Sequence, residues 1–538
     1  MPKAAVLLAA CAALGASAPS PPPSTVPPSP PSNSPSASPA PSTTPPGPAA
    51  GPTAPPLTVA PALAQVPVGS SAQVSVGSAI SPIAATVRDP SIVAVSVDQT
   101  ALRVTLTGLA VGTTTLHLSD ARGVTRDVPV RVANYAGAVE SHLALQLTGD
   151  PASAAFVREQ VSGALRGATH ARPGADVLVT PDDVPVHAPL EVDDVASFDV
   201  PVLIQGSQYF EVDGSTRVDV ANVAVPRISP NSLMVSDYPE RLTENGTLFT
   251  ADLRYDQPSR FLYFHYNPGG QPDRRIVLRA ANLSSEPSIV QFISGEGGPS
   301  ANEMEAGHAA TRRFLVNVVQ NQGRLLTIPG NSAINIVAQA LPARTIACNL
   351  LQLRVLSGGN VHLTLFAQDA SDDPNAAVGA ADLLEATHKH ARGIYPIAEF
   401  HFATQWSVDR EYLELPIGEL PLPNHLVGEA LAGDYGVLQS FVVTLENPLS
   451  TPAAIALYEN PRGGRSTATY LIDGVLVQSH QVPPYSRYKV RQYVVPARGF
   501  VRVTIVTMPE AGSSLPLKLI FAPDDGSVAP GAPGSPIY

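Results

Sequence analysis

The tightest pair of metal-binding side chains in this sequence is His388-Lys389-His390, with Glu385 shortly before it. Imidazole nitrogens and carboxylates are zinc ligands, but a zinc site needs three or four of them, and no further ligand follows at motif spacing. The sequence also contains no H-E-x-x-H, C-x-x-C or EF-hand motif. We therefore assign neither a metal nor a cofactor, and we interpret the histidine pair as a solvated helix end.

Residues suited to nucleophilic, phosphate or glycosidase chemistry are equally sparse. No G-x-S-x-G motif occurs, and Cys348 lies in an apolar run typical of a buried small side chain. The glycine-rich segment 294–300 (SGEGGPS) lacks the Lys-Ser/Thr of a P-loop, so we expect a turn there. Acidic pairs such as Asp193-Asp194 and Asp372-Asp373 have no aromatic cluster around them, which does not favour glycoside hydrolysis. We predict no enzymatic activity.

Aromatic side chains give the pattern that most favours binding. In the run 261–267 (FLYFHYN), a period of two places Tyr263 and His265 on the same face of a strand. One face must belong to a core, and the other would offer rings that stack on sugars. The chain's single tryptophan, Trp406, lies in a similar strand-like run. Tyr263, His265 and Trp406 are thus possible ligand-stacking residues, with core or interface positions as the alternative.

Composition indicates which elements would position such residues. A length of 538 residues predicts several domains, and 56 prolines and 40 glycines with only 14% charged residues favour short strands and turns. The formal net charge is −12, and no Lys/Arg-rich face is present to neutralise phosphates, so we expect no nucleic-acid partner. The two cysteines, Cys11 and Cys348, are not expected to form a disulfide.

The first 56 residues predict export and projection. Residues 1–18 have the Lys, apolar stretch and small residues of an export signal. Within them, residues 8–11 (LAAC) resemble the lipobox of bacterial lipoproteins, which would make Cys11 a lipidation site and anchor the protein in a membrane. Residues 16–18 (ASA) instead match an ordinary signal-peptidase site; we favour the lipobox. Residues 19–56 are uncharged and rich in Pro, Ser and Thr, which predicts an extended tether.

Period-two patterning with frequent turn residues predicts a mainly β, multidomain fold. We expect an Ig-like β-sandwich over residues 57–133. Residues 134–185 contain two strand patterns around an apolar stripe typical of a helix, and so predict a small α/β module. Residues 186–255 form a β-rich connecting region.

Three segments of the first unit carry a family resemblance. Residues 89–93 (DPSIV), 108–116 (GLAVGTTTL) and 120–123 (DARG) resemble a bacterial Ig-like domain and, equally, the N-terminal module of pilus-assembly secretins. The resemblance covers residues 57–133 and implies an extracytoplasmic β-module without catalytic residues. The following strand–helix–strand pattern resembles the small α/β domains of secretins and of BON-type envelope proteins, but no segment resembling the large secretin barrel follows.

The C-terminal half contains an internal duplication of one sequence unit. Asn282 and Asn447 each follow an apolar run, and the same three landmarks follow each asparagine in the same order. These are a Gly-Gly pair (297–298, 463–464), Pro-Ala-Arg (342–344, 496–498) and Phe-Ala-x-Asp (366–369, 521–524). We predict that each asparagine caps a turn leaving the first strand of its unit, by bonding backbone two or three residues on.

This duplication predicts two homologous β-sandwiches, over residues 256–370 and 391–526, with a linker at 371–390 and a loose tail at 527–538. Phe366 and Phe521 should occupy equivalent, buried positions. The shared residues are turn and core types, and none is reactive. Catalysis confined to one copy would have its seat in the loops around His425, Asp434 and Tyr435.

The sequence therefore favours a non-enzymatic exported cell-envelope protein, a structural, adhesive or assembly scaffold that projects β-modules from a tether. One alternative is a carbohydrate- or peptidoglycan-binding protein, and another is an accessory subunit of a pilus or secretion system. The expected partners are envelope proteins or glycans, and a membrane through Cys11.

Overall fold

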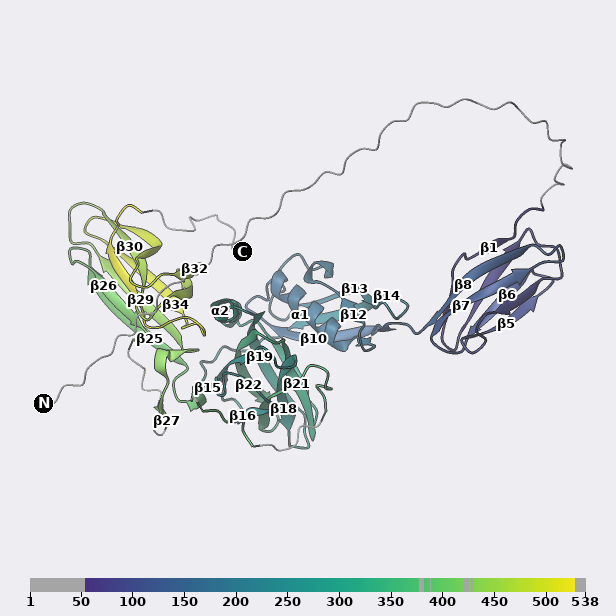
Figure 1. The fold of residues 1–538 in the computed structure, drawn as a ribbon. Helices are drawn as coiled ribbons and strands as arrows, with labels where there is room; N and C mark the ends of the chain where they lie inside the picture. Colours follow the sequence, from purple (N-terminus) through teal and green to yellow (C-terminus); the bar gives the residue numbers. More distant parts are fainter. Residues whose placement is uncertain (1–53, 377–381, 388, 420–424, 427–428, 528–538) are drawn as a thin grey trace, which may run out of the picture.

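The computed structural model describes residues 54–376, 382–387, 389–419, 425–426 and 429–527 (Figure 1). Strands make up 54% of the structure and helices 8%, so the predicted mainly β, multidomain fold class is confirmed. None of the helices in these ranges is both long enough and apolar enough to cross a membrane. Cys11 and most of the predicted tether lie outside the described residues.

The N-terminal domain is a sandwich of two four-stranded sheets, ordered β1-β3-β6-β5 and β2-β8-β7-β4. Its strands are β1 (Thr58–Ala60), β2 (Ala64–Pro67), β3 (Ser71–Gly77), β4 (Ala84–Val87), β5 (Val93–Asp98), β6 (Arg103–Gly108), β7 (Gly112–Ser119) and β8 (Thr125–Ala133). Alternate valines and leucines point inward, as the period of two predicts, and Val104, Leu106 and Leu116 are fully buried.

The α/β module follows without a break. It consists of β9 (Gly137–Ala138), β10 (His142–Thr148), α1 (Ala154–Ala168), β11 (His170–Ala171), β12 (Asp176–Leu178), a 3-10 turn η1 (Pro181–Asp183), β13 (Val195–Gln205) and β14 (Val212–Asn222). Ser153 caps α1 by accepting a hydrogen bond from the Phe156 amide. The strands β13 and β14 come from residues 186–255, which were expected only to connect, yet they pair with each other and with β10 and β12.

The first sandwich shares a sheet with the α/β module. Its elements are β15 (Ser232–Ser236), β16 (Gly246–Leu253), β17 (Ser259–Asn267), β18 (Arg274–Asn282), β19 (Ser288–Ser300), α2 (Glu303–Val319), β20 (Gly323–Ile328), β21 (Ser332–Leu341), β22 (Thr345–Ser357) and β23 (Val361–Asp369). Because β20 pairs with β10, one ten-stranded sheet runs through both units, and β24 (Arg392–Tyr395) forms its far edge beside β15. Because the strands of both units are hydrogen-bonded into one continuous sheet, these two units form a single body.

The second sandwich completes that body. Its elements are β25 (Glu399–Ser407), β26 (Leu413–Ile417), β27 (His425–Leu426), β28 (Glu429–Ala430), η2 (Ala432–Asp434), β29 (Leu438–Glu446), β30 (Ala453–Pro461), β31 (Ser466–Ile472), β32 (Val475–Val482), β33 (Tyr488–Val495), β34 (Phe500–Thr507) and β35 (Leu517–Pro523). Figure 1 shows α2 between the two sandwiches, and its Ala306 and Phe314 share a buried cluster with Met508 and Ala511 of the second sandwich.

The two sandwiches have the same strand order, as a duplicated unit predicts. One sheet reads β20-β19-β22-β17-β15 in the first and β32-β31-β34-β29-β25 in the second. The other reads β16-β23-β18-β21 and β26-β35-β30-β33. The Pro-Ala-Arg landmarks lie between equivalent strands, and Arg344 and Arg498 both have a positive φ, of 65° and 50°. Phe366 and Phe521 lie in equivalent strands and are 2% and 0% exposed, as predicted for their burial. Their predicted equivalence is wrong, because Phe521 points into the core between the two sheets, whereas Phe366 lies on the other face of its strand, against Arg279.

The asparagine landmark, however, pairs different residues from those predicted. Asn282 ends β18 and Asn447 follows β29, strands that are not equivalent and are not the first of their units. The counterpart of Asn447 is Asn267, at the end of β17. Their Nδ2 atoms donate to the carbonyls of Leu341 and Val495, the last residues of the equivalent strands β21 and β33, at 2.9 and 3.0 Å.

Local chemistry explains the wrong pairing. Asn282 and Asn447 each accept, through Oδ1, a hydrogen bond from the amide two residues on, at 3.0 Å in both cases. Each also donates through Nδ2 to the carbonyl four residues on. Each asparagine therefore caps a turn, as predicted. The pairing failed because the same turn chemistry follows two non-equivalent strands and produces similar local sequences.

The glycine-rich segment 294–300 is also not the turn that was expected. It is the end of β19, whereas Gly463 lies in the loop between β30 and β31. A Cβ at Gly295 or Gly297 would overlap the backbone of α2, so these glycines let the helix lie directly on the strand. The helix α2 was not predicted, although Asn302 caps it through a hydrogen bond from the Met304 amide and two glutamates occupy its first turn.

Candidate functional site

The N-terminal domain joins the body through a short linker that is fixed by backbone hydrogen bonds. Between β8 and β9, the Asn134 carbonyl accepts from the Phe210 amide at 2.8 Å, and the Ala136 amide donates to the Phe210 carbonyl at 2.7 Å. Phe210 belongs to the loop between β13 and β14. The linker is therefore paired to this loop like a short strand, which sets the position of Tyr135 between the two bonded residues.

Arg131 of β8 clamps the same loop from the N-terminal domain. Its Nη2 donates to the carbonyls of Ser207 and Tyr209, at 2.8 and 3.1 Å. Its guanidinium carbon lies 5.3 Å from the centre of the Phe210 ring, within cation–π range. Tyr135 packs edge-on against Phe210 with ring centres 6.2 Å apart. Arg131 and the two rings together form the joint between the domain and the body.

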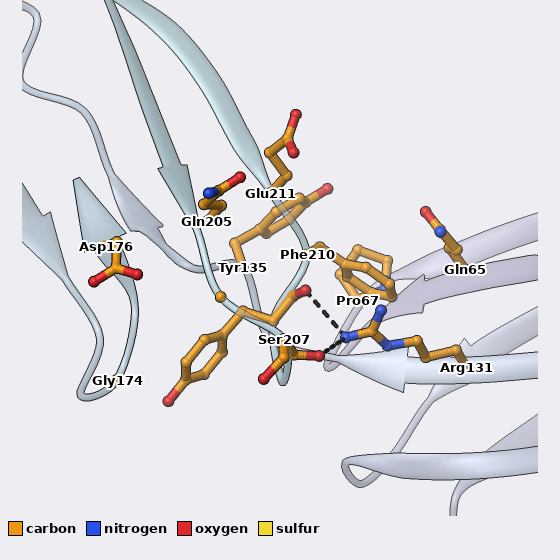
Figure 2. A pocket seen from close by; sticks show the side chains of 12 residues that line it. Gln65, Pro67, Arg131, Tyr135, Gly174, Asp176, Gln205, Ser207, Phe210 and Glu211 are labelled. Atoms are coloured by element: carbon orange, nitrogen blue, oxygen red, sulfur yellow. Dashed lines mark hydrogen bonds between the residues drawn. The ribbon is translucent and has the colours of Figure 1, made fainter. Parts of the chain in front are cut away.

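A cleft of about 860 Å³ opens beside this joint, and we call it the junction cleft (Figure 2). It is lined by Gln65, Pro67, Arg131, Tyr135, Gly174, Asp176, Gln205, Gly206, Ser207, Tyr209, Phe210 and Glu211. Figure 2 shows Gln65 and Arg131 on the side of the N-terminal domain and Asp176 on the side of the α/β module. A cleft at a domain junction, with a volume in the range of about 300–1,000 Å³, is a typical place for ligand binding.

The polar groups of the junction cleft are suited to hydrogen bonding rather than to catalysis. Asp176, Glu211, Gln65 and Gln205 are exposed, and within the described ranges the structure records no side-chain hydrogen bond or ion pair for them. No histidine, lysine or cysteine lines the cleft in the described part of the chain. The site therefore offers free carboxylates and amides beside an aromatic ring, without a nucleophile paired to a base.

Comparison with known proteins bears on the domain that carries Arg131. Residues 60–133 match the family model described as the pilus formation protein N terminal region. This match confirms the resemblance of the N-terminal domain to the module of pilus-assembly secretins, and it covers that domain alone. A comparison with curated protein sequences found no match.

Solved structures resemble the chain only distantly. Domains 5–6 of the S-layer protein SbsC are 14% identical over 31% of this chain and 96% of theirs, with a TM-score of 0.14. Fibronectin(III)-like modules of CbhA from Clostridium thermocellum are 15% identical over 32% and 98%, with a TM-score of 0.17. SGBP-B of Bacteroides ovatus, solved with a mixed-linkage heptasaccharide, is 10% identical over 56% and 72%, with a TM-score of 0.13. TM-scores this far below 0.5 carry no functional argument.

The aromatic residues singled out from the sequence lie elsewhere and are buried. Tyr263 and His265 are 0% exposed in the first sandwich, and Trp406 is 3% exposed in the core of the second. The Tyr263 hydroxyl donates to Gln339 Oε1 at 2.6 Å, and burial lowers the pKa of His265 to about 4. Their assignment as ligand-stacking residues is wrong, because both faces of the strand β17 are covered, one by the opposite sheet and one by α2.

Of the histidine pair, only His390 belongs to the described residues. His388 lies outside them. His390 lies between two carboxylates, 3.4 Å from Asp237 Oδ2 and 3.2 Å from Glu240 Oε2. The bond to Asp237 raises the pKa of His390, and burial raises the pKa of Asp237 to about 6. Across the described ranges, no group of three or more His, Cys, Asp or Glu side chains is arranged to hold a metal ion.

The other sequence candidates are also enclosed. Cys348 is fully buried, and burial raises the pKa of its thiol. Asp434 is 1% exposed, and the Tyr435 hydroxyl donates to the Ser513 carbonyl at 2.8 Å. The side chain of His425 lies outside the described residues. Of the residues that sequence analysis considered for catalysis, Asp434 and Tyr435 therefore pack against the protein.

Sequence reasoning missed a buried ionisable cluster where α2 meets the second sandwich. His308 Nδ1 lies 2.9 Å from Glu510 Oε2, and the hydroxyls of Thr467 and Thr469 each donate to Glu510 at 2.7 Å. Nearby, Arg260 is fully buried and donates to Glu399 Oε1 at 2.9 Å. Paired charges at an interface hold its two sides in one arrangement, since separating them would leave a buried charge uncompensated. These pairs join residues far apart in the chain, so no local motif indicates them.

Proposed function

We propose that this chain is a non-enzymatic scaffold of the bacterial cell envelope and serves as an accessory subunit of a pilus or secretion system. The observation that carries the proposal is the way in which the pilus-type N-terminal domain is attached. Within the described residues, its side-chain hydrogen bonds to the body come from Arg131 alone, and the rest of the connection is the linker at 134–136. A domain held at one small joint is presented to partners over most of its surface.

The body behind this joint suits a spacer. The ten-stranded sheet joins the α/β module to the first sandwich, and the buried pairs Arg260–Glu399 and His308–Glu510 join the first sandwich to the second. In Figure 1 the N-terminal domain lies at one end of the molecule and the second sandwich at the other. A rigid body of this kind fixes the distance and orientation at which the N-terminal domain meets its partners.

Export and anchoring complete the proposal. The leader at residues 1–18 would direct the chain out of the cytoplasm, a lipid on Cys11 would hold it at a membrane, and residues 19–56 would form the tether. Metabolic labelling with a palmitate analogue tests the anchor. Label on the wild type that is lost in Cys11→Ala supports it, and an unlabelled, freely secreted wild type contradicts it.

The scaffold function is tested by crosslinking in the producing bacterium. The full chain should crosslink to identified pilus or secretion-system subunits, and deletion of residues 57–133 should abolish those crosslinks. A variant that lacks residues 19–40 keeps every folded domain and serves as a control for chain length. If the deletion of 57–133 leaves the same crosslinks in place, the N-terminal domain does not make the contact and the proposal fails.

A further inference from the structure

We propose that the junction cleft binds a short glycan that carries no negative charge, with Tyr135 as the platform on which a sugar ring stacks. The proposal goes beyond the scaffold function, and it uses residues that sequence analysis did not single out. It rests on the rigid exposed ring, the unpartnered polar groups around it and the sign of the charge that remains in the cleft.

Tyr135 has the properties of a stacking platform. Its side chain is 51% exposed, so one part of the ring contacts protein while the rest faces solvent. The ring packs edge-on against buried Phe210, which Arg131 covers in turn. A ring that is already held in place loses little conformational freedom when a ligand binds. Aromatic faces pack well against apolar surface, and the C–H face of a pyranose is such a surface.

The groups around this ring match hydroxyl groups. Gln205, Glu211, Gln65 and Asp176 line the same cleft as Tyr135 (Figure 2). A carboxylate accepts two hydrogen bonds side by side, and a carboxamide both donates and accepts. Sugar hydroxyls both donate and accept as well, and neighbouring hydroxyls present these functions in pairs. The four side chains can therefore form hydrogen bonds with a polyhydroxylated ligand, so that the hydroxyl groups of the ligand are not left unpaired.

The charge in the cleft selects against anions. Arg131 is the single cation among the lining residues, and its Nη2 is already bonded to the carbonyls of Ser207 and Tyr209. The carboxylates of Asp176 and Glu211 thus set the local charge, and like charges repel at short range. Acidic polysaccharides and phosphate-bearing ligands are disfavoured, whereas neutral sugars and N-acetylated sugars are accepted.

An extended peptide fits the cleft less well. Two sheet edges border it, because β2 and β12 are edge strands and contribute Gln65, Pro67 and Asp176. These strands are only four and three residues long, and Pro67 has no amide hydrogen to donate. Strand addition relies on a run of main-chain hydrogen bonds, which edges this short do not provide.

The test uses the full chain, isothermal titration calorimetry, and the tetrasaccharides of β-1,4-linked N-acetylglucosamine and of β-1,4-linked glucose as probes. We expect saturable binding of at least one tetrasaccharide and no binding of tetragalacturonate. Tyr135→Ala should weaken the affinity at least tenfold. The matched control is Tyr412→Ala, since Tyr412 is 52% exposed but lies in the second sandwich, and it should bind as the wild type does.

Two further variants separate binding from the integrity of the joint. Tyr135→Trp keeps a stacking ring and should retain affinity within about threefold. Glu211→Gln and Asp176→Asn keep the packing and should each weaken binding severalfold, with unchanged thermal unfolding. Failure of the wild type to bind either tetrasaccharide at millimolar concentration overturns the proposal. So does equal affinity in Tyr135→Ala, or a preference for tetragalacturonate or for a peptide.

Discussion

Gly307 of α2 lies against the backbone of Ala511 in the second sandwich, so close that a Cβ at Gly307 would overlap the Ala511 carbonyl oxygen. Reciprocally, a Cβ at Gly512 would meet the Glu303 carbonyl of α2. Helix and loop are therefore in backbone-to-backbone contact. Glycine inside a helix lowers stability by roughly 0.5–1 kcal/mol relative to alanine, and this close contact explains why α2 nevertheless contains one. This contact is one of the features that unite the two sandwiches.

Gly307→Ala should destabilise the body despite the higher helix propensity of alanine. The added methyl group must displace the 510–512 loop, and overpacking of this kind costs about 1–3 kcal/mol. Urea unfolding followed by circular dichroism measures the change. Gly163→Ala in α1 is the control, because the nearest atom to its Cβ would be 3.9 Å away. It should be neutral or stabilising; equal effects of the two substitutions would contradict the packing argument.

His308 should make the interface between the sandwiches sensitive to pH. Burial alone would lower the pKa of His308, but the hydrogen bond and the negative charge of Glu510 outweigh it and raise the pKa. Arg312 and His480 also face this histidine, and the charge of Arg312 opposes the rise. The folded protein thus binds this proton more tightly than the unfolded chain, in which the pKa of histidine is about 6.5.

The stabilising contribution of His308 is complete below that pH and is lost as the pH rises through its folded-state pKa. The free energy of unfolding of the wild type should therefore fall between pH 6 and pH 9 more steeply than that of His308→Gln. Urea titrations at several pH values compare the two proteins. His187→Gln, at an exposed position, should keep the wild-type slope. Parallel curves for wild type and His308→Gln would refute the role of the pair.

Phe366 and Phe521 should each stabilise the sandwich to which they belong. Each is almost fully buried, Phe521 in the core of the second sandwich and Phe366 against Arg279 on the other face of the equivalent strand, so substitution by alanine should cost about 3–5 kcal/mol. Phe500 is 67% exposed, and Phe500→Ala should change stability by less than about 0.5 kcal/mol. Chemical denaturation of the three variants checks this, and a small effect of either buried substitution would show that its site does not pack as a core position.

Arg131 should control the joint of the N-terminal domain without supporting the body. Arg131→Ala removes two hydrogen bonds and the contact with Phe210, so cleavage at the linker 134–136 by a non-specific protease should become faster. Thermal unfolding of the body should stay unchanged. Arg103 is an exposed residue within the same domain, and Arg103→Ala should be cleaved at the wild-type rate. An unchanged rate in Arg131→Ala would mean that the linker bonds alone hold the joint.

Some of these features are readable from local sequence, and others are not. Alternation of apolar and polar residues indicated the strands of the N-terminal sandwich, and an apolar stripe indicated the helix that is α1, because side-chain period follows directly from backbone geometry. The pairing of Asn282 with Asn447 failed although both cap turns. The capping residues indicate the local structure of the next two to four residues, and they do not indicate which strand precedes the turn. The helix α2 was missed because its capping signal lies within a repeat that was expected to be all strand.

Local sequence was enough to predict the fold class, the two sandwich units, the resemblance of the N-terminal domain to a pilus module and the burial of Phe366 and Phe521, because periodicity, turn residues and family motifs are local properties. The exposure of the aromatic rings, in contrast, depends on how distant segments pack against them. Tyr263 and Trp406 are covered by layers from distant segments, whereas Tyr135 stays exposed in the junction cleft. The junction cleft and the His308–Glu510 pair join residues about 70 to 200 positions apart, and such neighbours are set by how sheets and domains pack rather than by any spacing along the chain.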